Sequence, residues 1–80
     1  MAGTLLLYSA PFCSLCEKAK LEIWPALSAT GYSLQEVCII DDDDLLERYQ
    51  FSIPVIKVEG TERELGWPFD ASAVLALIQG

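Results

Sequence analysis

Short apolar runs alternate along this chain with segments of helical spacing, a pattern that predicts alternating strands and helices. The run Thr4–Tyr8 is followed by a Ser-Ala-Pro break, which is typical of a buried strand. The next segment predicts an amphipathic helix, because apolar residues recur there every four positions, at Leu15, Ala19, Ile23 and Leu27. We expect this helix to pack on the sheet through that stripe.

The predicted helix contains one residue that disturbs helices and is followed by another that ends them. Pro25 lacks the amide that would bond to the carbonyl of Leu21, so a kink or an early end is expected there. Gly31 is a suitable terminator. Ser33–Ile40 is predicted to be a second strand, parallel to the first because a helix connects them, so both strands should end at the same edge of the sheet.

The second half of the chain predicts a short helix, a hairpin and a final helix. Asp41–Asp44 supplies an N-cap and an acidic first turn for the short helix. Ile53–Glu59 and Glu62–Gly66 are predicted strands, and the short turn at Gly60 makes them an antiparallel hairpin. Asp70 can cap a last helix whose apolar positions are Ala71, Val74, Leu75 and Ile78. The expected order is β-α-β-α-β-β-α, an α/β fold.

Length and composition indicate one folded unit, a single domain over residues 1–80. A chain of 80 residues buries only about 60% of the surface that its unfolded form exposes, so its core is modest. Its 52% hydrophobic and 21% charged residues are typical of globular proteins. The apolar runs are shorter than the roughly 20 residues of a membrane span, and no basic segment marks a secretory signal. We therefore expect a cytoplasmic protein.

The charge of the chain narrows the choice of partners. Five basic and twelve acidic residues give a net charge of −7, which repels nucleic acid and anionic membranes, so neither is an expected partner. A basic protein partner is compatible with this charge, although a surface charged for solubility explains it more simply. Asp41–Asp44 lacks the alternating ligands and the glycine of a calcium-binding EF-hand loop, so helix capping is the better interpretation.

The chemistry of the chain centres on its cysteines. Three are present, and in a reducing compartment they favour redox activity or metal binding over a structural disulfide framework. Cys13 and Cys16 form a C-x-x-C at the start of the predicted helix, where they share one face and can close a small disulfide. Zinc sites use the same spacing, so the motif alone leaves both chemistries open. Cys38 is predicted to be a packed core cysteine rather than an auxiliary thiol.

Two stretches of the chain resemble those of a known superfamily. The segment from Tyr8 to Cys16 looks like the active-site stretch of thioredoxin-fold proteins, and Phe51–Val55 looks like their cis-proline stretch. Together with the element order and the short length, they resemble the glutaredoxin branch. The resemblance implies a thioredoxin-like fold, with a four-stranded mixed sheet flanked by three helices.

The resemblance also implies a role for each motif cysteine. Cys13 would be the nucleophile, because unpaired amides and the helix dipole at an exposed N-terminus stabilise a thiolate. Cys16 would resolve the mixed disulfide. The dipole contributes only about 0.3–1 kcal/mol, and no charged residue precedes Glu17, so we expect moderate acidity for the Cys13 thiol.

Substrate contacts follow from the same resemblance. Pro54 would adopt a cis peptide facing Cys13, and the backbone of Ile53 would pair with an extended substrate segment. Tyr8 is expected to pack in the core, whereas Trp67 lies in a loop between Gly66 and Pro68. The expected substrate-binding residues are Phe12, Ser14, Leu15, Ile53, Pro54 and Trp67.

The chain departs from the glutaredoxin pattern where glutathione would bind. Ala10 replaces a basic residue three positions before Cys13, and Gly66 with the displaced Asp70 stands in for paired glycines and an aspartate. Arg48 remains as a cation that could meet a carboxylate, but at an exposed helix position it more often makes a weak surface ion pair. The expected substrate is therefore a disulfide-containing protein or a small thiol compound, and glutathione is only weakly supported.

We expect a small monomeric thiol-disulfide oxidoreductase without a cofactor or a resident metal. One alternative is a metal or iron-sulfur site in which two subunits each contribute Cys13 and Cys16. The other is a non-catalytic interaction module that retains the fold and the motif.

Overall fold

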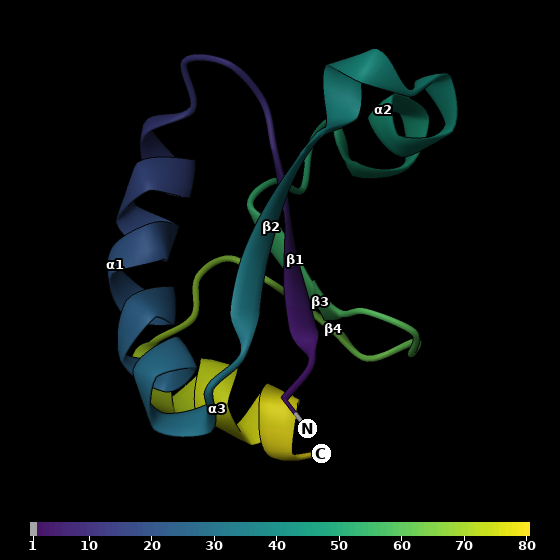
Figure 1. Ribbon diagram of the computed structural model, residues 1–80. Helices are drawn as coiled ribbons and strands as arrows, with labels where there is room; N and C mark the ends of the chain where they lie inside the picture. Colours follow the sequence, from purple (N-terminus) through teal and green to yellow (C-terminus); the bar gives the residue numbers. More distant parts are fainter. Residues whose placement is uncertain (1) are drawn as a thin grey trace.

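The computed structural model describes residues 2–80 and confirms the expected α/β architecture (Figure 1). The strands are β1 (Thr4–Ser9), β2 (Ser33–Cys38), β3 (Val55–Val58) and β4 (Glu64–Gly66). The helices are α1 (Ser14–Thr30), α2 (Asp43–Tyr49) and α3 (Ala71–Gln79). A short 3₁₀ turn, η1 (Ile39–Asp41), precedes α2 and ends the second strand at Cys38 instead of the predicted Ile40.

The strands form one mixed sheet in the order β2-β1-β3-β4. β1 and β2 are parallel, as the connecting helix predicted, and Ser9 pairs with Cys38 where both strands end. β3 runs antiparallel to β1 and to β4, so the predicted hairpin is confirmed. We call the edge at which β1 and β2 end and β3 begins the redox end, after the chemistry that the sequence predicts for the C-x-x-C motif there. Figure 1 shows the loop between β1 and α1 and helix α2 at this end, far from the termini.

Side-chain alternation along β1 divides the core between the two faces of the sheet. Leu5 and Leu7 are fully buried in a core that includes residues of α1 and α3. Tyr8 lies in a second core with Tyr49 of α2, because neighbouring side chains on a strand point to opposite faces. The Tyr8 and Tyr49 rings stack with their centroids 4.6 Å apart. Tyr8 therefore packs in the core, as expected.

Helix α1 buries a stripe that differs from the predicted one at its start. Ala19, Ile23 and Leu27 are buried as expected, but Leu15 is 41% exposed and Cys16 takes the first inward position. A strict four-residue repeat drifts by about 40° per step around a helix of 3.6 residues per turn. Over three steps this drift carries Leu15 out of the buried stripe.

The end of α1 confirms one prediction and excludes the early end that was one of the two outcomes predicted at Pro25. Gly31 ends the helix at a φ of 76°, and its N–H donates to the carbonyl of Leu27 at 2.8 Å. The helix does not end early, because it continues through Pro25 to Thr30. Pro25 and Leu21 are exposed, so water can satisfy the carbonyl that the missing amide leaves free.

Two aspartates cap the remaining helices. The side chain of Asp42, within the predicted acidic segment, accepts from the N–H of Asp44 at 2.9 Å and starts α2. Asp70 accepts from the N–H of Ala73 at 2.8 Å and starts α3 as predicted.

No helix in residues 2–80 combines the length and the apolar character needed to span a membrane.

Candidate functional site

The two motif cysteines meet at the N-terminus of α1. Cys13 is the N-cap of the helix, and it forms a disulfide with Cys16 across a Cα–Cα distance of 5.3 Å. The N–H of Cys16 donates to the Sγ atom of Cys13 at 3.2 Å. This amide is one of the orphan donors of a helix start, and it provides a hydrogen bond that would stabilise a negatively charged Cys13 sulfur.

The two sulfurs differ in accessibility. Cys13 is half-buried, whereas Cys16 is 2% exposed and faces the sheet. A substrate can therefore approach Cys13, while Cys16 is reached only from within the protein. This difference favours Cys13 as the attacking atom and Cys16 as the atom that closes the internal disulfide.

Phe12 is an exposed residue directly before the motif. Its backbone has a φ of 62°, a left-handed conformation that residues other than glycine adopt at a cost of about 1–3 kcal/mol. Its side chain is fully exposed, with a relative exposure of 106%. Ser14 and Leu15 are also exposed, so the structure places these three predicted contact residues on the surface around Cys13.

The Ile53-Pro54 peptide is cis and lies at the redox end. It precedes Val55, which pairs with Tyr8 near the end of β1, and the Pro54 side chain is fully buried. The N–H of Ile53 already donates to the carbonyl of Tyr49 at 3.1 Å. The carbonyl of Ile53 has no hydrogen-bond donor within residues 2–80.

Trp67 packs inward from the loop before α3. It is half-buried against the α1/α3 core and makes an edge contact with Phe69, with ring centroids 5.1 Å apart. The backbone N–H of Trp67 donates to the carbonyl of Pro54 at 3.0 Å. The peptide bond between Trp67 and Pro68 is cis. Trp67 is thus linked to the Pro54 segment by a backbone hydrogen bond.

Cys38 does not lie in either core. It is a half-buried free thiol at the end of β2, opposite Ser9 of β1. The prediction of a packed core cysteine is therefore wrong, because η1 begins immediately after Cys38 and the sheet ends there.

A charged cluster next to the motif was missed by the sequence reasoning. The Nζ atom of Lys20 lies 2.9 Å from Glu17 and 2.8 Å from Glu36, and the hydroxyl of Ser9 donates to Glu36 at 3.1 Å. These contacts join α1 to the ends of β1 and β2. The hydrogen bond from Lys20 lowers the pKa of Glu36, and the hydrogen bonds to Glu36 and Glu17 raise the pKa of Lys20.

We expect Glu36→Gln to reduce stability near neutral pH and to have less effect in acid. A lowered carboxyl pKa contributes stability above the unfolded value of 4.5, and this contribution is lost as pH falls through the folded value. Both partners are partly solvated, so the loss near pH 7 should be about 0.5–1 kcal/mol. Urea unfolding of the wild type and of Glu36→Gln, from neutral to acidic pH, measures this loss of stability. Glu59→Gln, on the exposed hairpin, is the control, and an equal loss at all pH values would contradict the assignment.

A tyrosine-carboxylate contact holds α2 over the sheet. The hydroxyl of Tyr49 donates to Glu64 at 2.8 Å, and burial together with this bond raises the pKa of Tyr49 to about 12. The guanidinium of Arg48 lies 5.7 Å from the centroid of the Tyr49 ring. Arg48 is exposed and stays accessible at the redox end.

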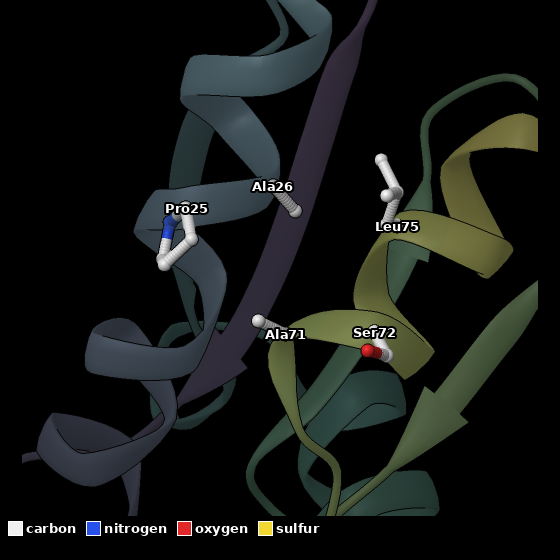
Figure 2. Close-up of a pocket in the computed structure, with 5 residues that line it drawn as sticks. All are labelled: Pro25, Ala26, Ala71, Ser72 and Leu75. Carbon is white, nitrogen blue, oxygen red and sulfur yellow. The ribbon is translucent and has the colours of Figure 1, made fainter.

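A surface hollow lies between α1 and α3 (Figure 2). Its lining residues are Pro25, Ala26, Ala71, Ser72 and Leu75. Pro25 is twelve positions after Cys13 on the same helix, about 18 Å along its axis at 1.5 Å per residue. This hollow is therefore separate from the cysteine site. Within residues 2–80, no three metal-ligating side chains gather into a cluster.

A family model described as a glutaredoxin-like domain (DUF836) matches residues 4–79. The chain belongs to this glutaredoxin-like family. No functionally curated protein matches it significantly.

Solved structures agree with this assignment. The X-ray structure of protein XcR50 from X. campestris is 35% identical, with a TM-score of 0.74 and coverage of 94% of this chain and 95% of that one. Its solution structure gives 34% identity and a TM-score of 0.78, covering 99% and 94%. Thioredoxin 1 from Thermosipho africanus is 15% identical, with a TM-score of 0.68 and coverage of 95% and 90%, and it shows the fold alone.

The fold is therefore thioredoxin-like, as the sequence resemblance implied. The glutaredoxin-like family and the paired Cys13 and Cys16 support a thiol-oxidoreductase-like role. The Glu17–Lys20 contact could have been found from its i,i+3 spacing on the helix. The bonds from Lys20 and Ser9 to Glu36 could not be predicted from residue spacing, because they join different helices and strands.

Proposed function

We propose that this protein reduces disulfides by thiol exchange through Cys13 and Cys16. The observation that carries the proposal is an accessible N-cap cysteine bonded to a buried one, with the Cys16 amide 3.2 Å from the Cys13 sulfur. The glutaredoxin-like family and the thioredoxin-like fold support the same chemistry. The resulting reaction is a two-electron transfer from the dithiol to the substrate.

In the first step the Cys13 thiolate attacks one sulfur of the substrate disulfide. The Cys13–substrate bond forms, the substrate S–S bond breaks, and the second substrate sulfur leaves as a thiolate that takes up a proton. The Cys16 amide and the start of α1 stabilise the attacking thiolate. The dipole supplies about 0.3–1 kcal/mol and a hydrogen bond to a charged group about 1.5–3 kcal/mol, so we expect moderate acidity for Cys13.

In the second step the Cys16 sulfur, after losing its proton, attacks the Sγ atom of Cys13. The internal disulfide forms as the mixed disulfide breaks, and the remaining substrate sulfur leaves as a thiolate. The substrate gains two electrons and the protein loses two. A thiol reductant must then return the Cys13–Cys16 disulfide to the dithiol before another cycle.

Replacing Cys16 with serine tests this order of events. We expect Cys16→Ser to accumulate a mixed disulfide on Cys13, because the first step remains and the resolving sulfur is gone. Mass spectrometry of the intact protein, after mixing with a disulfide-containing model protein, measures the trapped species. Cys38→Ser is the matched control and should turn over like the wild type.

Two outcomes would contradict the mechanism. One is a trapped adduct on Cys38 instead of Cys13, and the other is unchanged multiple turnover in Cys16→Ser. Metal analysis of freshly purified reduced protein distinguishes the rival interpretation of a site shared by two subunits. Stoichiometric zinc or iron that is lost in both Cys13→Ser and Cys16→Ser would favour that interpretation.

A further inference from the structure

We propose that the redox end docks disulfide-containing protein segments that are apolar beside the cysteine and positively charged around it. This inference rests on the proposed function and specifies its substrate class. Two features of the surface carry it. One is a group of exposed apolar side chains at the redox end, and the other is a concentration of acidic residues at the same end.

The apolar group contains four of the six large hydrophobic side chains that are exposed in residues 2–80. Phe12, Leu15, Ile40 and Phe51 have relative exposures of 106%, 41%, 53% and 93%. They lie on the loop and first turn around Cys13, on η1 after β2, and on the segment before Pro54. All three segments meet at the redox end because β1 and β2 end there and β3 begins there. We call these four side chains the apolar collar.

Two members of the apolar collar are exposed almost completely. A phenylalanine side chain buries roughly 150–250 Å² in a folded protein, so leaving one in water forgoes a large favourable contribution. Phe12 also holds a backbone conformation that favours glycine, directly before Cys13. The exposed Phe12 ring, one residue before Cys13, is therefore available to a chain joined to the Cys13 sulfur. An apolar residue next to the substrate cysteine would cover that ring.

The acidic residues gather at the same end. The segment from η1 to Pro54 contains Asp41–Asp44 and Glu47, five of the twelve acidic residues, against the single cation Arg48. Asp41–Asp44 and Glu47 are all exposed. Lys20, the cation one turn after Cys16, is neutralised by its contacts with Glu17 and Glu36. Lys18 is also exposed on this turn. At this end seven carboxylates still outnumber the three cations Lys18, Lys20 and Arg48; they are Glu17, Glu36, Asp41–Asp44 and Glu47. The field that an approaching substrate meets is therefore negative.

This field discriminates between the two kinds of disulfide considered for the site. Glutathione carries two carboxylates and one ammonium group, so a glutathione mixed disulfide brings negative charge toward a negative surface. A protein segment with lysine or arginine near its cysteine is attracted instead. Such steering changes association rates by about 10-fold or more at low salt and fades as salt increases. The free carbonyl of Ile53 can accept a hydrogen bond from the backbone of the docked segment.

Two synthetic peptide disulfides test the proposal. Both carry leucine and valine beside the cysteine, one is flanked by lysines and the other by glutamates. We expect the reduced wild-type protein to react with the lysine peptide at least about 10-fold faster at low salt, with the ratio shrinking at high salt. Equal rates at low salt, or a faster glutamate peptide, would overturn the proposed substrate class.

Variants at the redox end separate the two contributions. The redox-end variant combines Asp41→Asn, Asp43→Asn, Asp44→Asn and Glu47→Gln, and it should lose most of the preference for the lysine peptide. Asp42 is kept because it caps α2. Glu59→Gln/Glu62→Gln, on the distant hairpin, is a charge control that removes two carboxylates instead of four, and it should keep the preference. A preference that survives the redox-end variant, or disappears in the hairpin control, would contradict the assignment.

The apolar collar is tested by two double variants, one inside the collar and one outside it. Phe12→Ser/Phe51→Ser should slow both peptides about 10-fold, because it removes contact area without changing charge. Leu21→Ser/Trp24→Ser removes two exposed apolar side chains on the outer face of α1 and should leave both rates unchanged. Equal slowing in both double variants would argue against a collar at the redox end.

Two further measurements keep docking distinct from exchange. Reduction of a small uncharged disulfide, hydroxyethyl disulfide, reports the proposed function alone. Binding of the same peptides with serine in place of cysteine, followed by isothermal titration calorimetry, reports docking alone. Reduction of the small disulfide with equal binding of both peptides would overturn the docking proposal only. Selective binding of the lysine peptide without any disulfide reduction would overturn the proposed function only.

Discussion

Cys13→Ser is expected to lower the rate of disulfide reduction on the order of 10³-fold or more, because it removes the group that forms the first covalent bond. Serine has no thiolate to attack a substrate sulfur. Cys16 cannot take over this step, since only 2% of it is exposed and it faces the sheet. Stopped-flow release of substrate thiol, measured with pre-reduced protein and no added reductant, gives the rate of this step directly.

Cys16→Ser is the matched control for this prediction. Both variants lose the internal disulfide and any stability that it provides, so a folding defect would affect them alike. Only the variant that keeps Cys13 should release one equivalent of substrate thiol in a single burst. A burst of similar size from Cys13→Ser would mean that Cys16 reacts first, and the proposed roles of the two cysteines would then be wrong.

Ile23→Ala is expected to lower the free energy of unfolding by about 2–5 kcal/mol. Ile23 is fully buried in the core that joins α1 to the sheet and to α3. Removing most of its side chain leaves a cavity that this small core fills only in part. Because domains of this kind are stable by only about 5–15 kcal/mol in total, the loss should be evident in the midpoint of urea unfolding of the oxidised protein.

Leu21→Ala on the same helix is the control for this effect. Leu21 is 69% exposed, so its truncation should change stability by no more than about 0.5 kcal/mol. Both variants place alanine in the interior of α1, which makes helix propensity a poor explanation for any difference between them. Equal losses in the two variants would indicate that α1 contributes little through its buried face.

The local features of the fold could be predicted from neighbouring residues. Gly31 and Asp70 end and begin helices through bonds to residues at most four positions away, and the sequence contains both partners of each bond. The start of α1 at the C-x-x-C is also set by a bond between residues close in the sequence, from the N–H of Cys16 to the Cys13 sulfur. The bounds of β2 and β3 were predicted less well, because η1 and the Pro54 segment shorten them through contacts that the apolar pattern does not encode.

The sequence by itself determined the order of the elements, the parallel pairing of β1 with β2 and the position of Cys13 and Cys16 at a helix start. These features follow from short-range spacing and from the handedness of a β-α-β connection. Only the tertiary structure decided that Cys13 is partly exposed while Cys16 is buried, and that the carbonyl of Ile53 has no hydrogen-bond donor within residues 2–80. It also decided that Phe12 and Phe51 share one end of the molecule. Each of these depends on contacts between residues far apart in the chain, which local spacing cannot specify.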